Sequence, residues 1–118
     1  MTAIIKGRNG WQATTLFPMG PAKERHGDKV GERVLEIYTR KEPRGGIHSR
    51  AMVMLKRDGW SQHAIGLGAG GDYSRGILRA GVKCTEKAVR ELHAAALLQA
   101  DTIMAEAVAH YAQEKAAA

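Results

Sequence analysis

The sequence predicts an α+β protein in which an antiparallel β-sheet of about four strands is followed by one long C-terminal α-helix. Between residues 33 and 84, short runs alternate apolar and polar side chains and are separated by Gly-rich and Asp-Gly turns. From Thr85 to about Lys115 the chain has no Pro or Gly and is rich in Ala, so its helix propensity is high throughout. With 118 residues, the chain has the size of a single domain.

The segment 1–31 is expected to be irregular and to precede a sheet-and-helix domain at residues 32–118. Residues 11–17 are a candidate short strand within this segment, and Pro18 and Pro21 follow it closely. That density of Pro and Gly favours an irregular connection over regular structure.

The four strands of the sheet are expected from local composition. Residues 33–40 are rich in β-branched and aromatic side chains and end at a Pro-Arg-Gly-Gly turn. Residues 47–57 and 60–67 flank an Asp-Gly pair, which is a strong hairpin signal between two strands. Residues 75–84 alternate again and lead into the helix, for which Thr85 is a suitable N-cap.

A G-x-G-x-x-G run lies between the last two predicted strands, at residues 66–71. Such a run binds a dinucleotide only where it closes a strand and opens a helix whose first N–H groups meet the pyrophosphate. Here a strand follows and no helix is expected before Thr85, so a nucleotide-using enzyme is disfavoured. The favoured interpretation is a glycine loop that joins two strands. A secondary interpretation is that the glycine-rich backbone lets an extended polymer approach the chain closely.

Patterns for catalysis and metal binding are not found in the sequence. The five histidines show no H-E-x-x-H spacing and have no Cys or carboxylate at ligand spacing. We therefore expect a protein that is not an enzyme and that needs no cofactor or metal. One cysteine, no signal-peptide pattern and no membrane-length apolar stretch favour a cytoplasmic protein without a membrane partner.

Positive charge is concentrated in the part of the chain that precedes the predicted helix. Residues 1–84 carry 15 Lys or Arg against 7 Asp or Glu, whereas residues 85–118 carry 3 against 5. This excess favours an anionic partner, in particular nucleic acid.

Strand alternation assigns the side chains of the sheet to two faces. Leu35, Ile37, Ala51 and Val53 are expected to pack under the helix, which leaves a basic opposite face with interspersed Tyr and Met side chains. That mixture suits single-stranded nucleic acid, because cations follow the phosphates while flat or apolar side chains receive the bases. Including the hairpin tips, the candidate binding residues are Tyr38, Arg40, Arg44, Arg50, Lys56, Arg57, Trp60, Arg75, Arg79 and Lys83.

An exposed sheet face can also be basic merely to remain soluble and unpaired. Met52 and Met54 share the expected basic face and argue against that explanation, because methionine is not a solubilising choice. They are equally compatible with a face that is covered by the first thirty residues.

The predicted helix carries an apolar stripe whose members recur at helical spacing. We expect part of it to join a second copy of the chain in a homodimer, or to bind a different protein. In the second case the protein is an interaction module, such as an inhibitor or adaptor of a nucleic-acid-handling complex. The candidate interface residues are Leu92, Ala96, Ile103 and Ala107.

The last predicted strand leads into the helix through Arg79-Ala80-Gly81-Val82-Lys83-Cys84-Thr85. This run and the order of four strands and one helix resemble the positive-cofactor-four family of single-stranded-DNA-binding coactivators and their bacterial and phage relatives. The resemblance covers residues 33 to about 111 and rests mainly on element order. The long N-terminal segment, the few aromatic residues and the longer Ala-rich helix depart from the family.

The resemblance implies a homodimer joined through its helices, with curved sheets that present basic hairpins to single-stranded or melted DNA. Two basic residues match those that precede the helix in the family, namely Arg79 and Lys83. Others match by strand position alone, namely Tyr38, Arg40, Arg50 and Lys56. Together the sequence predicts a non-catalytic protein that binds single-stranded DNA or RNA.

Overall fold

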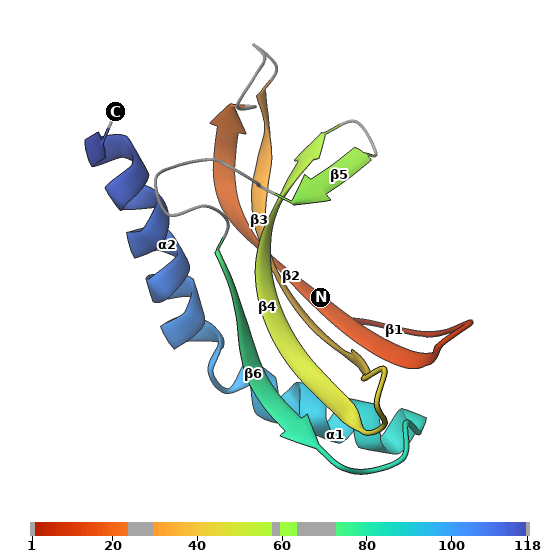
Figure 1. Ribbon diagram of the computed structural model, residues 1–118. Helices are drawn as coiled ribbons and strands as arrows, with labels where there is room; N and C mark the ends of the chain where they lie inside the picture. The colour runs from red at the N-terminus through yellow and green to blue at the C-terminus, as the bar shows by residue number, and fades with distance from the viewer. Residues whose placement is uncertain (1, 24–29, 58–59, 64–72, 118) are drawn as a thin grey trace.

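A computed structural model describes residues 2–23, 30–57, 60–63 and 73–117, in which six β-strands precede two α-helices (Figure 1). The strands are β1 (Thr2–Gly7), β2 (Gly10–Lys23), β3 (Val30–Lys41), β4 (Ile47–Arg57), β5 (Trp60–His63) and β6 (Ser74–Ala80). The helices are α1 (Glu86–Leu97) and α2 (Ala100–Ala117). The expected α+β class is confirmed, since an antiparallel sheet is followed by helical structure at the C-terminal end.

All six strands belong to one antiparallel sheet. Strands β1 to β4 are paired in chain order, which leaves the second edge of β4 for both β5 and β6. Strand β5 pairs with residues 54–57 of β4, and β6 pairs with residues 47–52. The glycine run at residues 66–71, like the end of the strand expected at 60–67, lies outside the described residues.

The N-terminal segment is not irregular as expected, because it supplies β1 and β2. The candidate strand at residues 11–17 is part of the 14-residue strand β2, which pairs with β3. A shift in register between Pro18 and Gly20 marks a β-bulge, which accommodates the Pro- and Gly-containing stretch without ending the strand. The structure therefore joins residues 2–23 to the same sheet as the rest of the chain.

The prediction of one long helix is wrong, because the helical part breaks at Leu98 and Gln99. The Gln99 N–H donates to the Ala96 carbonyl, which tightens the chain before α2 begins. In Figure 1 the strands bend, and α1 and α2 follow the outside of this bend. A straight helix would leave one part of a bent sheet uncovered, whereas the break lets both helices pack on it.

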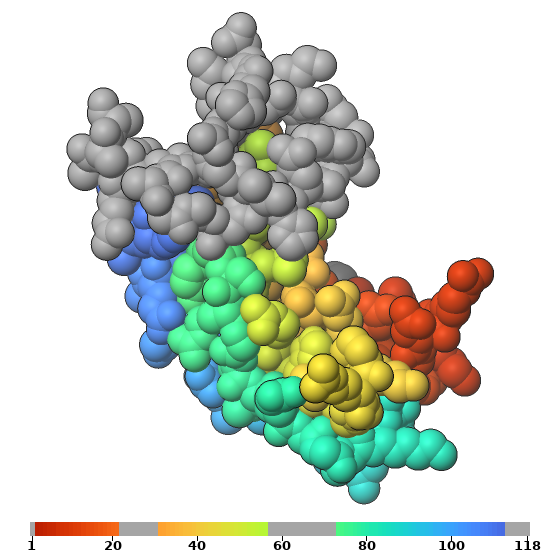
Figure 2. Space-filling view, in the orientation of Figure 1, coloured from red at the N-terminus to blue at the C-terminus, as the bar shows by residue number. Residues whose placement is uncertain are grey.

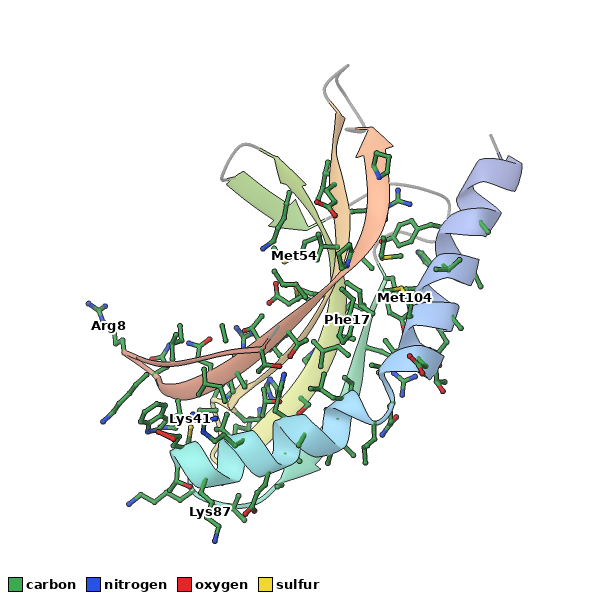
Figure 3. The ribbon with its side chains drawn as sticks, turned by 180° about the vertical axis from the view of Figure 1, so that it is seen from behind. Arg8, Phe17, Lys41, Met54, Lys87 and Met104 are labelled. Carbon is green, nitrogen blue, oxygen red and sulfur yellow. The ribbon has the colours of Figure 1, made fainter. Side chains whose placement is uncertain are left out.

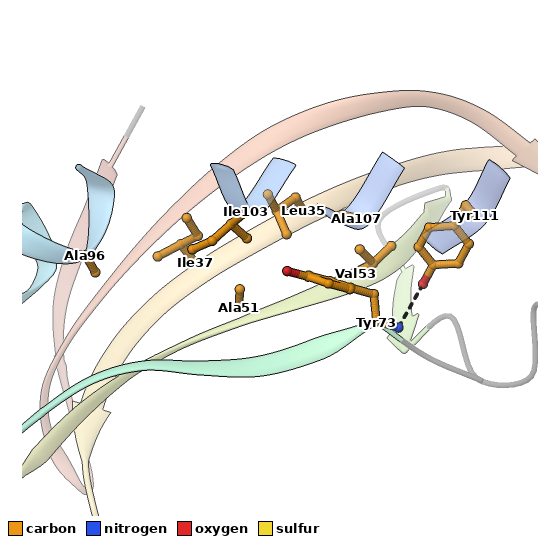
Figure 4. Packing of buried hydrophobic residues seen from close by; sticks show 9 residues of the cluster. All are labelled: Leu35, Ile37, Ala51, Val53, Tyr73, Ala96, Ile103, Ala107 and Tyr111. Carbon is orange, nitrogen blue, oxygen red and sulfur yellow. Dashed lines mark hydrogen bonds between the residues drawn. The ribbon is translucent and has the colours of Figure 1, made fainter. Parts of the chain in front are cut away.

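Both helices contribute to the main core on one face of the sheet (Figure 4). The expected helix-side residues Leu35, Ile37, Ala51 and Val53 have no exposed surface, so this part of the alternation is confirmed. The helices and the residue that precedes β6 complete this cluster with Tyr73, Ala96, Ile103, Ala107 and Tyr111.

The same packing corrects the expected interface on the helices. Ala96, Ile103 and Ala107 are fully buried against the chain's own sheet, so assigning them to a dimer or partner interface is wrong. Leu92 is half-buried and packs on a second cluster around Val89. The apolar stripe is used to close the core of a single chain.

A β-bulge in β6 changes the expected faces of that strand. Residues 49 and 50 of β4 pair with residues 78 and 76 of β6, so Ile77 is an extra residue in the ladder. Alternation continues out of phase across a bulge. Arg79 therefore lies on the face opposite the helices, whereas Arg75 lies on the face that they cover. Strand β6 also ends at Ala80, four residues before the expected end.

Candidate nucleic-acid interface

The face of β3, β4 and β6 opposite the helices is termed here the open face. In Figure 1 the helix α1 passes behind β6, so the open face of β4 and β6 is turned toward the viewer, and Figure 2 shows their side chains adjoining there. The register aligns Tyr38 with Arg50 and Arg40 with His48, and it places Arg79 beside His48. Four of the predicted binding residues are thus brought together on this face, namely Tyr38, Arg40, Arg50 and Arg79.

Tyr38 is a support for cations and does not serve as a free stacking surface. Its side chain is only 6% exposed. The guanidinium carbon of Arg40 lies 4.6 Å from the Tyr38 ring centroid, and the His48 ring meets the same ring edge-on at a centroid distance of 6.3 Å. The cation–π contact orders Arg40, which itself remains exposed.

The Glu42 carboxylate contacts two side chains of the site, Arg79 and His48. Its Oε1 accepts a hydrogen bond from Arg79 Nη2 at 2.8 Å and lies 3.1 Å from His48 Nδ1. The hydrogen bond from Arg79, assisted by the one from His48, holds the pKa of Glu42 below its usual value. Glu42 is therefore an anion at neutral pH and offsets part of the charge of Arg79, whose side chain is 78% exposed.

Two hollows lie on either side of the His48–Glu42 pair. The hollow between β4 and β6 has a volume of about 630 Å³ and is bordered by Arg50, Arg79 and the bulge of β6. A second hollow of about 520 Å³ lies between the β1–β2 and β3–β4 hairpins. Its lining residues are Asn9, Trp11, Gln12, Arg40, Lys41, Glu42, Pro43 and His48.

The antiparallel register gathers exposed cations at one end of the sheet. The β1–β2 turn, the β3–β4 turn and the connection from β6 to α1 all lie at this end, and Figure 3 shows Arg8, Lys41 and Lys87 there. We define the basic end as eight exposed residues, namely Lys6, Arg8, Arg40, Lys41, Arg44, Arg79, Lys83 and Lys87.

The backbone of the β3–β4 turn explains how two of these segments approach each other. Gly45 and Gly46 have φ angles of 99° and 82°, which L side chains rarely adopt. A Cβ atom at Gly46 would lie 2.8 Å from the carbonyl oxygen of Ala80. Glycine therefore lets the turn that carries Arg44 lie against the end of β6.

The positive potential of the basic end also includes the N-terminus of α1. The Thr85 side chain caps this helix by accepting a hydrogen bond from the Ala88 N–H at 3.1 Å. The helix dipole adds partial positive charge close to Lys83 and Lys87. Glu86, in the first turn, forms an ion pair with Arg90 at 3.0 Å.

Two of the predicted binding residues, Arg75 and Lys56, do not join this arrangement. Arg75 lies on the helix-covered face, where its Nη1 forms an ion pair with Glu106 Oε2 at 2.8 Å, so its assignment to the binding face is wrong. Lys56 is half-buried and lies opposite Glu32 in the β3–β4 register, near the other end of the sheet. The side chains of Arg57 and Trp60 lie outside the part of the chain whose side chains are described.

Sequence reasoning missed several residues of the basic end, namely Lys6, Arg8, Lys41 and Lys87. The Asn9-Gly10 pair was a usable signal, because Asn-Gly favours a hairpin: Arg8 and Asn9 join β1 to β2, and Gly10 begins β2 with a φ of 100°. No local pattern places Lys87 beside these turns, because that proximity depends on how α1 packs on the sheet.

Comparisons with protein-family models, with curated proteins and with solved structures returned no match. Within the described ranges, no helix is both long and apolar enough to cross a membrane. The described side chains likewise form no cluster of three or more His, Cys, Asp or Glu suited to a metal ion.

Proposed function

We propose that the protein binds single-stranded nucleic acid, DNA or RNA, without catalysis, through the basic end and the adjoining open face. The observation that carries this proposal is the convergence of exposed cations from three separate segments, residues 6–9, 40–46 and 79–87, at one end of the sheet. The acidic residues in these segments are Glu42 and Glu86, and both are paired with cations.

The shape and composition of the open face favour a single strand over a duplex. Phosphates of either form can pair with the exposed Lys and Arg side chains. Only a single strand has unstacked bases that can enter the two hollows beside His48 and contact Met52 and Met54, which are half-buried on this face.

An interaction module that docks through the helix stripe has less support. That interpretation relied on Ala96, Ile103 and Ala107, which are buried in the core of the chain itself.

The proposal is tested by fluorescence anisotropy with labelled single-stranded DNA, single-stranded RNA and duplex DNA. We expect micromolar or tighter binding to single strands, weaker binding to the duplex, and a steep loss of affinity between about 50 mM and about 200 mM salt. Unchanged anisotropy with both single strands at low salt would reject the proposal.

A pair of matched double variants locates the site. Arg44→Gln with Lys83→Gln removes two charges from the basic end, and Arg75→Gln with Arg90→Gln removes two charges from elsewhere on the chain. We expect the first pair to weaken binding by about tenfold and the second to leave it within about twofold, as for loss of phosphate contacts. Equal weakening by both pairs would show that only net charge matters.

A further inference from the structure

We propose that the hollow between β4 and β6 receives one unstacked nucleobase of the bound strand. This inference rests on the proposed function and extends it, because it assigns base recognition to a defined position. The volume of about 630 Å³ lies within the range of pockets that bind small organic ligands.

The hollow owes its space to Gly76. This residue faces Arg50 across the β4–β6 ladder at the bulge, so no side chain of β6 fills the position opposite the arginine. A Cβ atom built there would lie 3.5 Å from Arg50 Nη1. The absence of a side chain therefore leaves open the space beside the guanidinium group.

Arg50 lies at one side of the hollow. Its Nη2 donates a hydrogen bond to Ser74 Oγ at 3.3 Å, and its side chain is half-buried. A planar guanidinium that lies along a strand is a surface on which an unstacked base can lie.

The remaining walls match the chemistry of a nucleotide. The bulge residue Ile77 is half-buried and gives the hollow an apolar border, which suits the face of a base better than a bare anion. Arg79, at the other side, is 78% exposed and available to a phosphate oxygen. His48 also lines the hollow, and its buried Nε2 has no hydrogen-bond partner in the described part of the chain.

The test compares an oligothymidylate of about twelve nucleotides with an abasic strand of the same length and charge. Base stacking contributes enough that the wild-type protein should prefer the base-bearing strand by at least about fivefold. The Gly76→Val variant fills the hollow with a residue that suits a strand, and its added Cβ makes only ordinary contact. We expect this variant to lose most of the preference while its affinity for the abasic strand is unchanged.

The control Gly81→Val adds the same side chain where no atom lies within 4 Å of the new Cβ, and it should behave as the wild type. If Gly76→Val fails to fold, Arg50→Lys gives the same test, because it keeps the charge and removes the planar group; it too should lose the preference. If the variant keeps the wild-type preference, or loses affinity for both strands equally, the proposal of a base-binding hollow is overturned and the proposed function is not. A wild-type protein that binds neither strand overturns the proposed function as well.

Discussion

Arg75 and Arg79 are four residues apart on the same strand and lie on opposite faces of the sheet. The bulge at Ile77 separates them, so Arg75 pairs with Glu106 of α2 while Arg79 pairs with Glu42 at the basic end. Strand β6 thus supplies Arg75, which contacts α2, and Arg79, which belongs to the proposed interface.

Substitution of Arg75 is expected to affect stability and not binding. The Arg75 and Glu106 side chains are 35% and 44% exposed, so Arg75→Gln should lower the free energy of unfolding by no more than about 1 kcal/mol. Urea denaturation measures this change, and oligonucleotide titration should show unchanged affinity. The matched Arg79→Gln variant should bind more weakly. A loss of affinity in Arg75→Gln equal to that in Arg79→Gln would contradict the separation of the two faces.

Removal of the Glu42 charge is expected to strengthen binding. Glu42 offsets part of the charge of Arg79, so Glu42→Gln should raise affinity for a single strand by about two- to tenfold at low salt. The control Asp101→Asn removes one negative charge at the start of α2, away from the basic end, and should raise affinity less. Weaker binding by Glu42→Gln would indicate that Glu42 has a positioning role that outweighs its charge.

We expect the free energy of unfolding to decrease as the pH falls below 6.5, because the imidazole of His93 is buried. Its Nε2 and Nδ1 each lie 2.8 Å from a threonine hydroxyl, of Thr15 and Thr39, and burial lowers its pKa. The unfolded chain then takes up a proton more readily than the folded one, so the stabilisation is complete above the unfolded pKa of about 6.5 and declines as the pH falls through it.

Urea denaturation at about pH 7.5 and about pH 5.5 measures this dependence. The His93→Gln variant retains hydrogen-bonding groups without a titratable ring and should lose much less stability between the two values. An equal decline in both proteins would show that other groups are responsible.

Ile103 is expected to contribute to the core and not to an interface between copies. Because its side chain is fully buried, Ile103→Ala should lower the free energy of unfolding by about 2 to 5 kcal/mol. Leu98→Ala is the matched control, since Leu98 is 88% exposed and its truncation should cost no more than about 0.5 kcal/mol. Light scattering should give the same molar mass for Ile103→Ala and the wild type wherever both are folded; a lower mass for the variant would assign Ile103 to an interface.

Much of the sheet could be predicted because its strands follow a period of two. Leu35, Ile37, Ala51 and Val53 lie on the helix-covered face as their alternation indicated. The same rule held for Leu78, Arg79 and Ala80 in β6 and failed for Arg75, because one extra residue at Ile77 shifts the alternation and only the neighbouring Gly76 gives a local sign of irregularity.

The helix break and the basic end depend on tertiary structure. No Pro or Gly marks the break at Leu98 and Gln99, which instead matches the bend of the sheet below it. Arg8, Lys41 and Lys83 are far apart in the sequence and become neighbours only through strand register. Local patterns therefore identified cations in the right strands without showing where they would meet.

The most direct test of the proposed interface is the salt dependence of binding to a single strand, measured for the wild type and for the Arg44→Gln and Lys83→Gln double variant. Each lost phosphate contact lowers the slope of log K against log salt concentration by about 0.7, so the variant's slope should be shallower by about 1.4. The Arg75→Gln and Arg90→Gln control should keep the wild-type slope. Equal slopes for the wild type and the basic-end variant would contradict binding at the basic end.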